Sequence, residues 1–292
     1  MPASSTAPTT TSRRRAARRW VAAVAVATGA LAGAAGAPAA QADFTLGCIT
    51  GTSVNDADYR YTYNHCRLPD IDQRRHNLQN EGRAHCVPTA FMNALSWLAR
   101  NGYPNLAPGA VDPHSASAED FNKISTQITL LGWSMGTSAV NGTAREGTLA
   151  GIRQTFKNAG YGDRLFVAWR SFETVGDPAR EMVKLGKGMD GKTNLVIPVV
   201  GWYKDGERTG GHAVTLERAS ATSTERSITI HDPADDLNLT TQSAVDSDTF
   251  KVGLNYGFRS KVEGYGTGRL DGAYVISRTP IVSSGSGPTW IG

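Results

Sequence analysis

The apolar residues of this chain change their spacing partway along the sequence, and that change constrains the fold more than any other feature. From Cys86 to Tyr161 they recur every three or four residues, the spacing of helices that bury one face. From Arg164 to Arg278 they form short runs rich in Val, Ile and Tyr between turn-forming residues, which is typical of strands. This order predicts an α+β fold with a helical N-terminal half and a sheet-rich C-terminal half.

The local signals place the individual elements. Ser117 is a possible cap for the second helix, and Asp177 followed by Pro178 is a typical helix start. We expect helices over 86–100, 117–132, 145–161 and 177–187. We expect strands over 164–170, 194–204, 211–219 and 226–232, and shorter ones over 249–254, 257–264 and 272–278.

Residues 1–42 have the pattern of a secretory signal peptide. A basic stretch, SRRRAARRW, precedes an apolar segment from Val21 to Ala37, and the sequence AQA ending at Ala42 fits a small-residue cleavage signal. We therefore expect cleavage after Ala42 and a secreted, extracellular protein. The alternative is an uncleaved membrane anchor, but the Ala- and Gly-rich segment is weakly apolar for that role.

The basic residues are concentrated in this signal. The whole chain has 30 Lys and Arg residues against 26 Asp and Glu residues, and residues 1–42 hold five arginines and no acidic residue. The rest of the chain therefore has 25 basic and 26 acidic residues. Such a balance gives no reason to expect nucleic acid, or an anionic membrane surface, as a partner.

Composition divides the rest of the chain into three parts. Residues 43–82 are rich in Asn, Asp, Tyr and Arg with little periodicity, and we expect them to form a loop-like but ordered N-terminal arm that belongs to the fold. Residues 83–280 contain the predicted helices and strands and form the main domain. Residues 281–292 contain SSGSGPTW and are expected to be a flexible tail.

The chain has three cysteines, an odd number for an exported protein. Cys48 and Cys66 lie 18 residues apart in the polar arm, and we expect them to form a disulfide worth about 3 kcal/mol. Cys86 is then the free thiol. In the alternative pairing, Cys86 is bonded to one of the other two.

Cys86 stands at the start of the first predicted helix. A helix N-terminus carries unpaired N–H groups and a partial positive charge, which together favour a thiolate. A cysteine that is also paired with a histidine can ionise at about 3–4 instead of about 8.5. Cys86 is therefore a candidate nucleophile that needs a base nearby.

Of the six histidines, His212 is the best candidate base. It follows two glycines, which let the backbone turn sharply and leave room for a substrate, and it opens the strand predicted over 211–219. The other five histidines have less suitable settings. Three lie in polar stretches that predict solvated side chains: His65, His76 and His114. His85 adjoins the cysteine, and His231 ends a strand.

Asp232 is the candidate for orienting the imidazole. If the strand over 226–232 returns antiparallel to the strand over 211–219, Asp232 comes to lie beside His212. The alternative is that Asp232 and Pro233 only initiate a turn. The preceding glycine–histidine pair and strand favour the orienting role.

Three segments, HCVPTAFMNALSWLARNGY, GGHAVTLERA and SITIHDPADD, together resemble the papain-like cysteine peptidases. They are most similar to the double-glycine (bacteriocin-processing) leader peptidase-like branch, over residues 79 to about 236. The resemblance implies a papain-like α+β fold, in which a helix carrying Cys86 packs on an antiparallel β-sheet carrying His212 and Asp232. It also implies cleavage of peptide or other amide bonds through a thioester, on an extracellular peptide or protein, without a cofactor or metal ion.

Enzymes of this family usually place a glutamine six residues before the nucleophile, where its amide stabilises the oxyanion. Here Asn80 lies six residues before Cys86 and Gln79 lies seven before it. Either amide could donate, and we take Gln79 as the catalytic candidate. The backbone N–H of Cys86 is the expected second donor.

Two other functions remain open. A cysteine acyltransferase of the transglutaminase type would use the same three residues, but would pass the acyl group to an amine. Its residues are normally closer in sequence than Cys86 and His212. A secreted binding module on a papain-like fold would use no catalysis at all.

Some patterns are incidental. Residues 186–193, GKGMDGKT, match a phosphate-binding loop, but the predicted helix precedes them and the predicted strand follows, the reverse of what such a loop requires. No metal-ligand spacing is present.

Trp202 and Tyr203 could line a substrate groove. Core positions are expected for Trp97, Trp133, Trp169 and Trp202.

Overall fold

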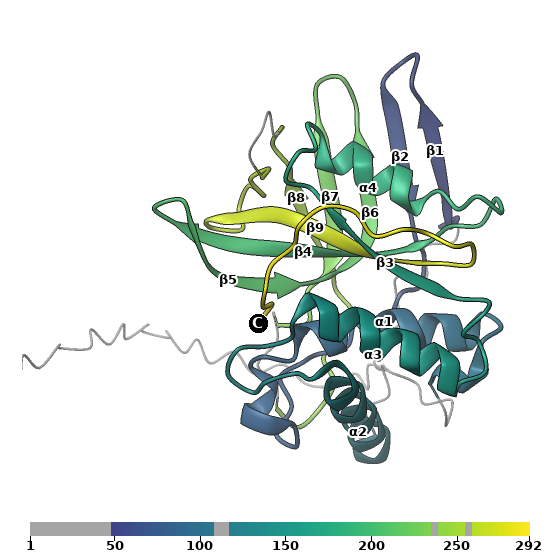
Figure 1. Cartoon of the computed structure of the whole chain (residues 1–292), viewed down its shortest axis with the longest axis vertical. Coiled ribbons are helices and arrows are strands. Elements are labelled where there is room, and N and C mark those ends of the chain that lie inside the picture. Colours follow the sequence, from purple (N-terminus) through teal and green to yellow (C-terminus); the bar gives the residue numbers. More distant parts are fainter. Residues whose placement is uncertain (1–47, 108–116, 235–238, 255–258) are drawn as a thin grey trace, which may run out of the picture. The chain divides into compact units, whose positions relative to one another are not determined.

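The computed structural model describes residues 48–107, 117–234, 239–254 and 259–292 (Figure 1). The predicted signal peptide, His114 and the first part of the strand predicted over 257–264 lie outside these residues. The described residues belong to one unit that extends to Gly292. Helices and antiparallel sheets are combined in it, so the predicted α+β class is confirmed.

Within this described part, four α-helices lie close to the predicted ranges. Two of the predicted caps are formed: the Ser117 side chain accepts a hydrogen bond from the N–H of Asp120, and Asp177 accepts one from the N–H of Arg180. Short 3₁₀ helices, η1 (Gln79–Gly82) and η2 (Pro104–Leu106), flank the first helix. The α-helices are α1 (Cys86–Arg100), α2 (Ala118–Met135), α3 (Arg145–Asn158) and α4 (Pro178–Gly186).

The strands that the structure describes form two antiparallel sheets. One has five strands in the order β1-β2-β6-β7-β8, and the other has four in the order β3-β9-β4-β5. The first sheet contains β1 (Gly51–Asn55), β2 (Arg60–Asn64), β6 (Thr215–Ala221), β7 (Arg226–His231) and β8 (Asp248–Lys251). The second contains β3 (Phe166–Ser171), β4 (Leu195–Lys204), β5 (Glu207–Ala213) and β9 (Gly268–Ser277).

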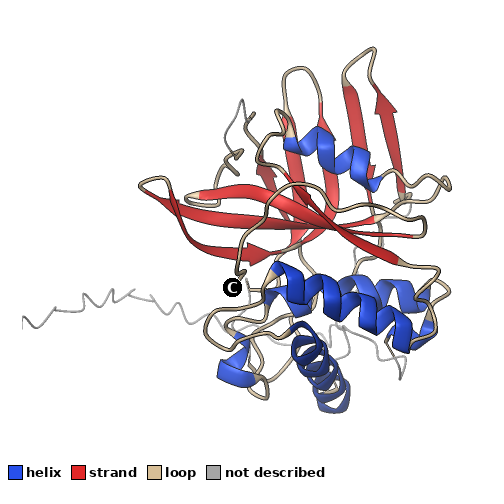
Figure 2. Ribbon diagram, in the orientation of Figure 1, coloured by secondary structure: helices blue, strands red, loops and turns tan. Residues whose placement is uncertain are grey.

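Two apolar cores hold these layers together. Helices α1 and α3 lie along one side of the four-stranded sheet and α4 lies on its other side, as Figure 2 shows. The first core joins the helices to the sheet and includes Phe91, Leu95, Ile152, Trp169 and Tyr274. The second joins α4 to both sheets and includes Tyr63, Met182, Val196, Leu216 and Ile230.

The single strand predicted over 211–219 is wrong, because the chain changes sheets within it. β5 ends at Ala213, and β6 begins at Thr215. At the corner, the N–H of Val214 donates to the carbonyl of Pro198 at 3.1 Å. Apolar residues continue through the corner because both sheets bury them, so periodicity cannot reveal the break. His212 consequently lies near the end of a strand, not at its start.

The arm over 43–82 contains more regular structure than its composition predicts. The expected disulfide joins Cys48 and Cys66, with their Cα atoms 5.9 Å apart. Between the two cysteines, β1 and β2 form a hairpin, and β2 pairs with β6. His65, predicted to be solvated, is completely buried beside Trp97. Alternate burial of Tyr61 and Tyr63 explains why a polar segment can form a strand.

The predicted flexible tail is instead held against the fold. The N–H of Ser171 donates to the carbonyl of Ser284 at 3.0 Å, and Ile291 exchanges two backbone hydrogen bonds with Thr143. The Ile291 side chain is buried in the first core. Small residues let this segment lie close to its neighbours: Gly287, for example, packs against the Trp169 ring. This low-complexity segment therefore makes defined contacts with the rest of the fold.

Two further predictions are wrong. Trp133, expected in the core, is 71% exposed on α2. In the described part of 257–264 there is no continuous strand, only isolated bridges of Lys261 with Arg269 and of Val262 with Val252.

Of the helices that the structure describes, none has both the length and the apolar character needed to cross a membrane.

Candidate active site

The backbone before Cys86 takes an unusual left-handed path. Asn80, Glu81 and Gly82 have φ angles of 51°, 52° and 75°. A side chain at Gly82 would place its Cβ 1.7 Å from the carbonyl oxygen of Gln73, so only glycine fits. This turn ends a few residues before α1 and puts Cys86 at the first position of that helix. Strain of this kind is commonly found near functional sites.

Gln73 connects the two ends of the candidate site. Its buried side-chain amide donates to the carbonyl oxygens of Gly82 at 3.0 Å and Arg83 at 3.1 Å. Its backbone N–H donates to the carbonyl of Pro233, the residue after Asp232, at 2.7 Å. One residue therefore ties the segment before Cys86 to the segment after Asp232. No sequence signal marked Gln73, because it lies in the irregular part of the arm.

Asn93 fixes helix α1 against the corner of the sheets. Its side chain accepts a hydrogen bond from the N–H of Ile71 at 2.9 Å and donates to the Thr215 hydroxyl at 3.0 Å. That hydroxyl in turn donates to the carbonyl of Ala90 at 3.3 Å. Because Thr215 lies three residues after His212, these bonds set the position of the helix relative to the histidine.

His212 and Asp232 are brought together as predicted. His231 pairs with Thr215 across β7 and β6, so Asp232 follows directly beside the corner. The Nε2 atom of His212 lies 2.5 Å from Oδ1 of Asp232. Both residues are buried, with exposed fractions of 5% and 8%.

Cys86 lies next to these two residues. It is a free, buried thiol, and it is close enough to the imidazole of His212 to act on the pKa of that histidine. Since Nε2 faces Asp232, Nδ1 is the ring nitrogen left for the thiol. The three residues predicted from the sequence thus lie side by side in one row, contributed by α1, β5 and the residue that follows β7.

The electrostatics of the row favour a charged imidazole. Burial alone would lower the pKa of His212, but the carboxylate of Asp232 and the contact with Cys86 outweigh it and raise the pKa to about 10. For Asp232, burial acts to raise the pKa, and His212, Tyr265 and the N–H of Ala234 together lower it to about 2. Near neutral pH, His212 is therefore an imidazolium and Asp232 a carboxylate.

Tyr265 and Ala234 complete the surroundings of the carboxylate. The Tyr265 hydroxyl donates to Oδ2 of Asp232, and the N–H of Ala234 donates to Oδ1 at 2.9 Å. Sequence reasoning did not identify Tyr265, which lies between Gly264 and Gly266 in a segment without a helix or strand pattern.

Aromatic rings cover the histidine and carboxylate. The Trp202 ring lies 5.9 Å from the His212 ring and stacks on Tyr265 at 6.1 Å, measured between centroids. Phe250 meets the Tyr265 ring edge-on at 5.1 Å. Trp202, predicted as a possible lining of the groove, is thus part of the site's surroundings. Because these rings exclude water, they strengthen the electrostatic interaction between the imidazole and the carboxylate.

The predicted oxyanion donors are less well placed. The Gln79 side chain is exposed, and the Asn80 amide donates to the carbonyl of Ala139 at 3.0 Å. Among the described residues, no hydrogen bond joins either amide to Cys86 or His212. The role of Gln79 therefore stays a prediction. The N–H groups of Cys86 and Val87 at the start of α1 have no intrahelical acceptor, and they are the better-supported donors.

A hollow of about 570 Å³ lies beside β5, and none of the three residues of the row lines it. Gly210 lines it and lies two residues before His212 on β5, which is about 7 Å along a strand. Val140 and Asn141 line it from the helical side. The remaining lining residues are Arg208, Thr209, Thr289, Trp290 and Gly292.

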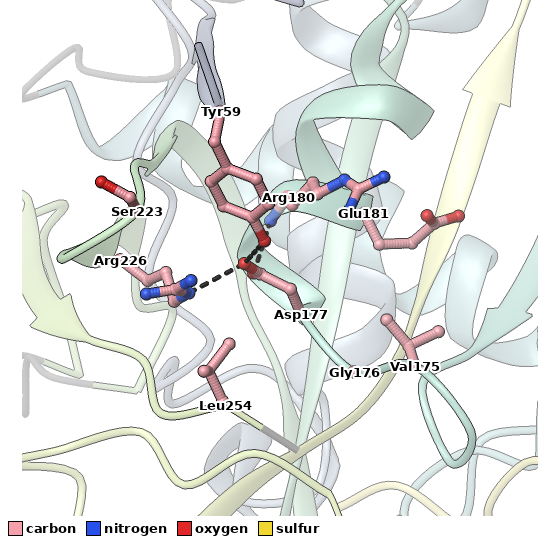
Figure 3. Close-up of a pocket in the computed structure, with 9 residues that line it drawn as sticks. All are labelled: Tyr59, Val175, Gly176, Asp177, Arg180, Glu181, Ser223, Arg226 and Leu254. Atoms are coloured by element: carbon pink, nitrogen blue, oxygen red, sulfur yellow. Dashed lines mark hydrogen bonds and ion pairs between the residues drawn. The ribbon is translucent and has the colours of Figure 1, made fainter. Parts of the chain in front are cut away.

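A second hollow, of about 690 Å³, lies beside α4 and the turn between β1 and β2. Figure 3 shows Tyr59 and Arg226 converging on Asp177 there. Arg180 lies over the Tyr59 ring. The lining contains none of the predicted site residues, and its Asp177 and Arg226 form an ion pair at 2.8 Å. In the part of the chain that the structure describes, no cluster of three or more potential metal ligands is present.

Comparison with known proteins adds no assignment. No protein-family model matches this chain, and none of the curated proteins matches it either. Any functional conclusion therefore rests on the chemistry of the residues described above.

Proposed function

We propose that this protein is a cysteine hydrolase with a papain-like fold that cleaves peptide or other amide bonds. The observation that carries the proposal is that Cys86, His212 and Asp232 lie together, with His212 bonded to Asp232 and its pKa raised by both neighbours. These residues come from a helix and two different sheets, so their meeting is a property of the whole fold. A nucleophile at a helix start, with its base on a packed sheet, is the arrangement on which the papain-like proposal rests.

The first half of the reaction forms a thioester. The Cys86 thiolate attacks the carbonyl carbon of the substrate, and the carbonyl oxygen becomes an oxyanion near the first turn of α1. The carbon–nitrogen bond then breaks, and the His212 imidazolium gives its Nδ1 proton to the leaving amine. Asp232 holds the Nε2–H and keeps the ring in the productive orientation.

The second half releases the acid. Neutral His212 removes a proton from water, and the resulting hydroxide attacks the thioester carbon. The carbon–sulfur bond breaks, which returns the thiolate and the imidazolium. An extracellular location is part of the proposal, and the disulfide between Cys48 and Cys66 supports an oxidising compartment.

The proposal predicts a covalent acyl intermediate on Cys86. The protein without residues 1–42 is incubated with a mixture of peptides, quenched in acid and examined by mass spectrometry. We expect acylated Cys86 and new carboxyl termini in the wild type, and neither product in the Cys86→Ser variant. His65→Ala is the control for loss of a buried histidine outside the row, and it should still cleave.

The products also separate the rival functions. Repeating the incubation with an added primary amine would yield new amides in place of free acids if the protein were a transglutaminase-type acyltransferase. An intact peptide mixture, with no acyl group on Cys86, would support the non-catalytic binding module and contradict the hydrolase.

A further inference from the structure

The carboxylate of Asp232 is held by donors on both of its oxygens. His212 and the N–H of Ala234 occupy Oδ1, and the Tyr265 hydroxyl occupies Oδ2. A carboxylate bound through one oxygen can still rotate about its bond to Cβ. Bonds to both oxygens stop that rotation and keep Oδ1 directed at the imidazole.

Tyr265 is itself firmly placed. Its N–H donates to the carbonyl of Val262 at 3.2 Å, and its own carbonyl accepts a hydrogen bond from the N–H of Gly268 at 3.0 Å. Its ring contacts those of Trp202 and Phe250. The segment before β9 therefore presents a hydroxyl to Asp232 from a ring that is packed against two other aromatic rings.

We propose that Tyr265 is a positioning residue that locks Asp232 toward His212 and thereby maintains the charged cysteine–histidine pair. This inference rests on the proposed hydrolase function. Without the Tyr265 hydroxyl, Oδ2 becomes a buried acceptor that has lost a donor, and the carboxylate can turn toward another one. The imidazolium then loses part of its stabilisation, and fewer thiols are ionised at a given pH.

The same molecule contains a matched control. On the neighbouring strand β4, the Tyr203 hydroxyl donates to Oδ1 of the completely buried Asp271, at 2.5 Å. Asp271 is also bound by Arg208 at 2.7 Å and Arg259 at 3.0 Å. Tyr203→Phe thus removes a tyrosine–aspartate bond of the same kind, but from a carboxylate that does not hold His212.

The test compares Tyr265→Phe with Tyr203→Phe in the protein without residues 1–42. The readout is the rate of Cys86 alkylation by iodoacetamide as a function of pH, with the modified residue mapped by mass spectrometry. For Tyr265→Phe we expect the midpoint of the profile to move to higher pH and the rate at pH 6 to fall about tenfold or more. Tyr203→Phe should keep the wild-type profile, and melting curves will show that both variants are folded.

A double-mutant cycle decides whether Tyr265 acts through Asp232. In the Asp232→Asn background, adding Tyr265→Phe should change the profile no further. The inference is overturned if Tyr265→Phe keeps the wild-type profile, or if it lowers the rate as much in the Asp232→Asn background as in the wild type. If His212→Ala leaves the profile unchanged, the proposed function itself fails, and that result is distinct from failure of Tyr265 alone.

Discussion

At the scale of single residues, the site depends on a few positions whose surroundings leave little choice. Asp232 sits between three donors, and His212 sits between Asp232 and Cys86. Each charged group lies beside a group of opposite charge or a hydrogen-bond donor. The buried charges are therefore paired, which offsets the free-energy cost of removing them from water. Gly82 shows the same constraint in the backbone, where a positive φ and the Gln73 carbonyl exclude any side chain.

Gly82→Ala should strongly destabilise the protein. The new Cβ would meet the Gln73 carbonyl oxygen, and alanine at φ of 75° is strained, for a combined loss of about 2 kcal/mol or more. Gly136→Ala is the matched control, because Gly136 has φ of 67° but an added Cβ would contact nothing within 4 Å. It should lose only about 1 kcal/mol. Urea denaturation of both variants measures the difference, and equal losses would show that the close contact is unimportant.

At the scale of elements, the start of α1 and the corner between β5 and β6 determine where the functional groups meet. Asn93 connects them, because it binds both the Ile71 N–H and the Thr215 hydroxyl. The hairpin of β1 and β2 extends the five-stranded sheet that contains β6. The N-terminal arm, which includes this hairpin, also contributes Gln73 to the site.

Replacing Asn93 by alanine should therefore loosen α1 from the corner. Two buried hydrogen-bonding groups lose their partner, which should lower the free energy of unfolding by about 2–3 kcal/mol. Asn101→Ala removes an exposed amide that donates to Trp97 at the end of the same helix, and its effect should stay within about 0.5 kcal/mol. Chemical denaturation compares the two. Losses of similar size would mean that the Asn93 bonds do not hold the helix.

The sequence was sufficient for some of these elements and insufficient for others. The helices and the caps at Ser117 and Asp177 could be predicted, because helix periodicity and capping are local. The sheet change at Val214 could not, since apolar residues continue through it. The exposure of Trp133 and the burial of Ile291 depend on which other elements cover them.

The candidate site, like the fold, could be predicted from the sequence only in part. Cys86, His212 and Asp232 could be predicted as a group because a helix start marks Cys86, two preceding glycines mark His212 and a strand end marks Asp232. Gln73 and Tyr265 could not, because their contacts join segments that are distant in the sequence and irregular in pattern. The structure brings the first three into contact, and their catalytic role remains the proposal to test.

At the scale of the whole molecule, the site combines all layers of the fold. The helical layer supplies the thiol, the four-stranded sheet supplies the imidazole, and the five-stranded sheet supplies the carboxylate. The hollow beside Gly210 is lined from both the helical side and the sheet side. An active Cys–His pair therefore requires the complete fold, and its reactivity reports whether the layers are assembled as described.

The measurement that tests the central claim most directly is the pH profile of Cys86 alkylation in the wild type and in His212→Ala. Under the proposal, the charged imidazole of His212 beside Cys86 favours the thiolate, so this thiol should ionise more easily than an unpaired cysteine. We predict that the wild type reacts at pH 6 nearly as fast as at pH 8. In His212→Ala the rate at pH 6 should fall by on the order of a hundredfold, because an ordinary thiol is almost entirely protonated there. Identical profiles for the two proteins would contradict the account.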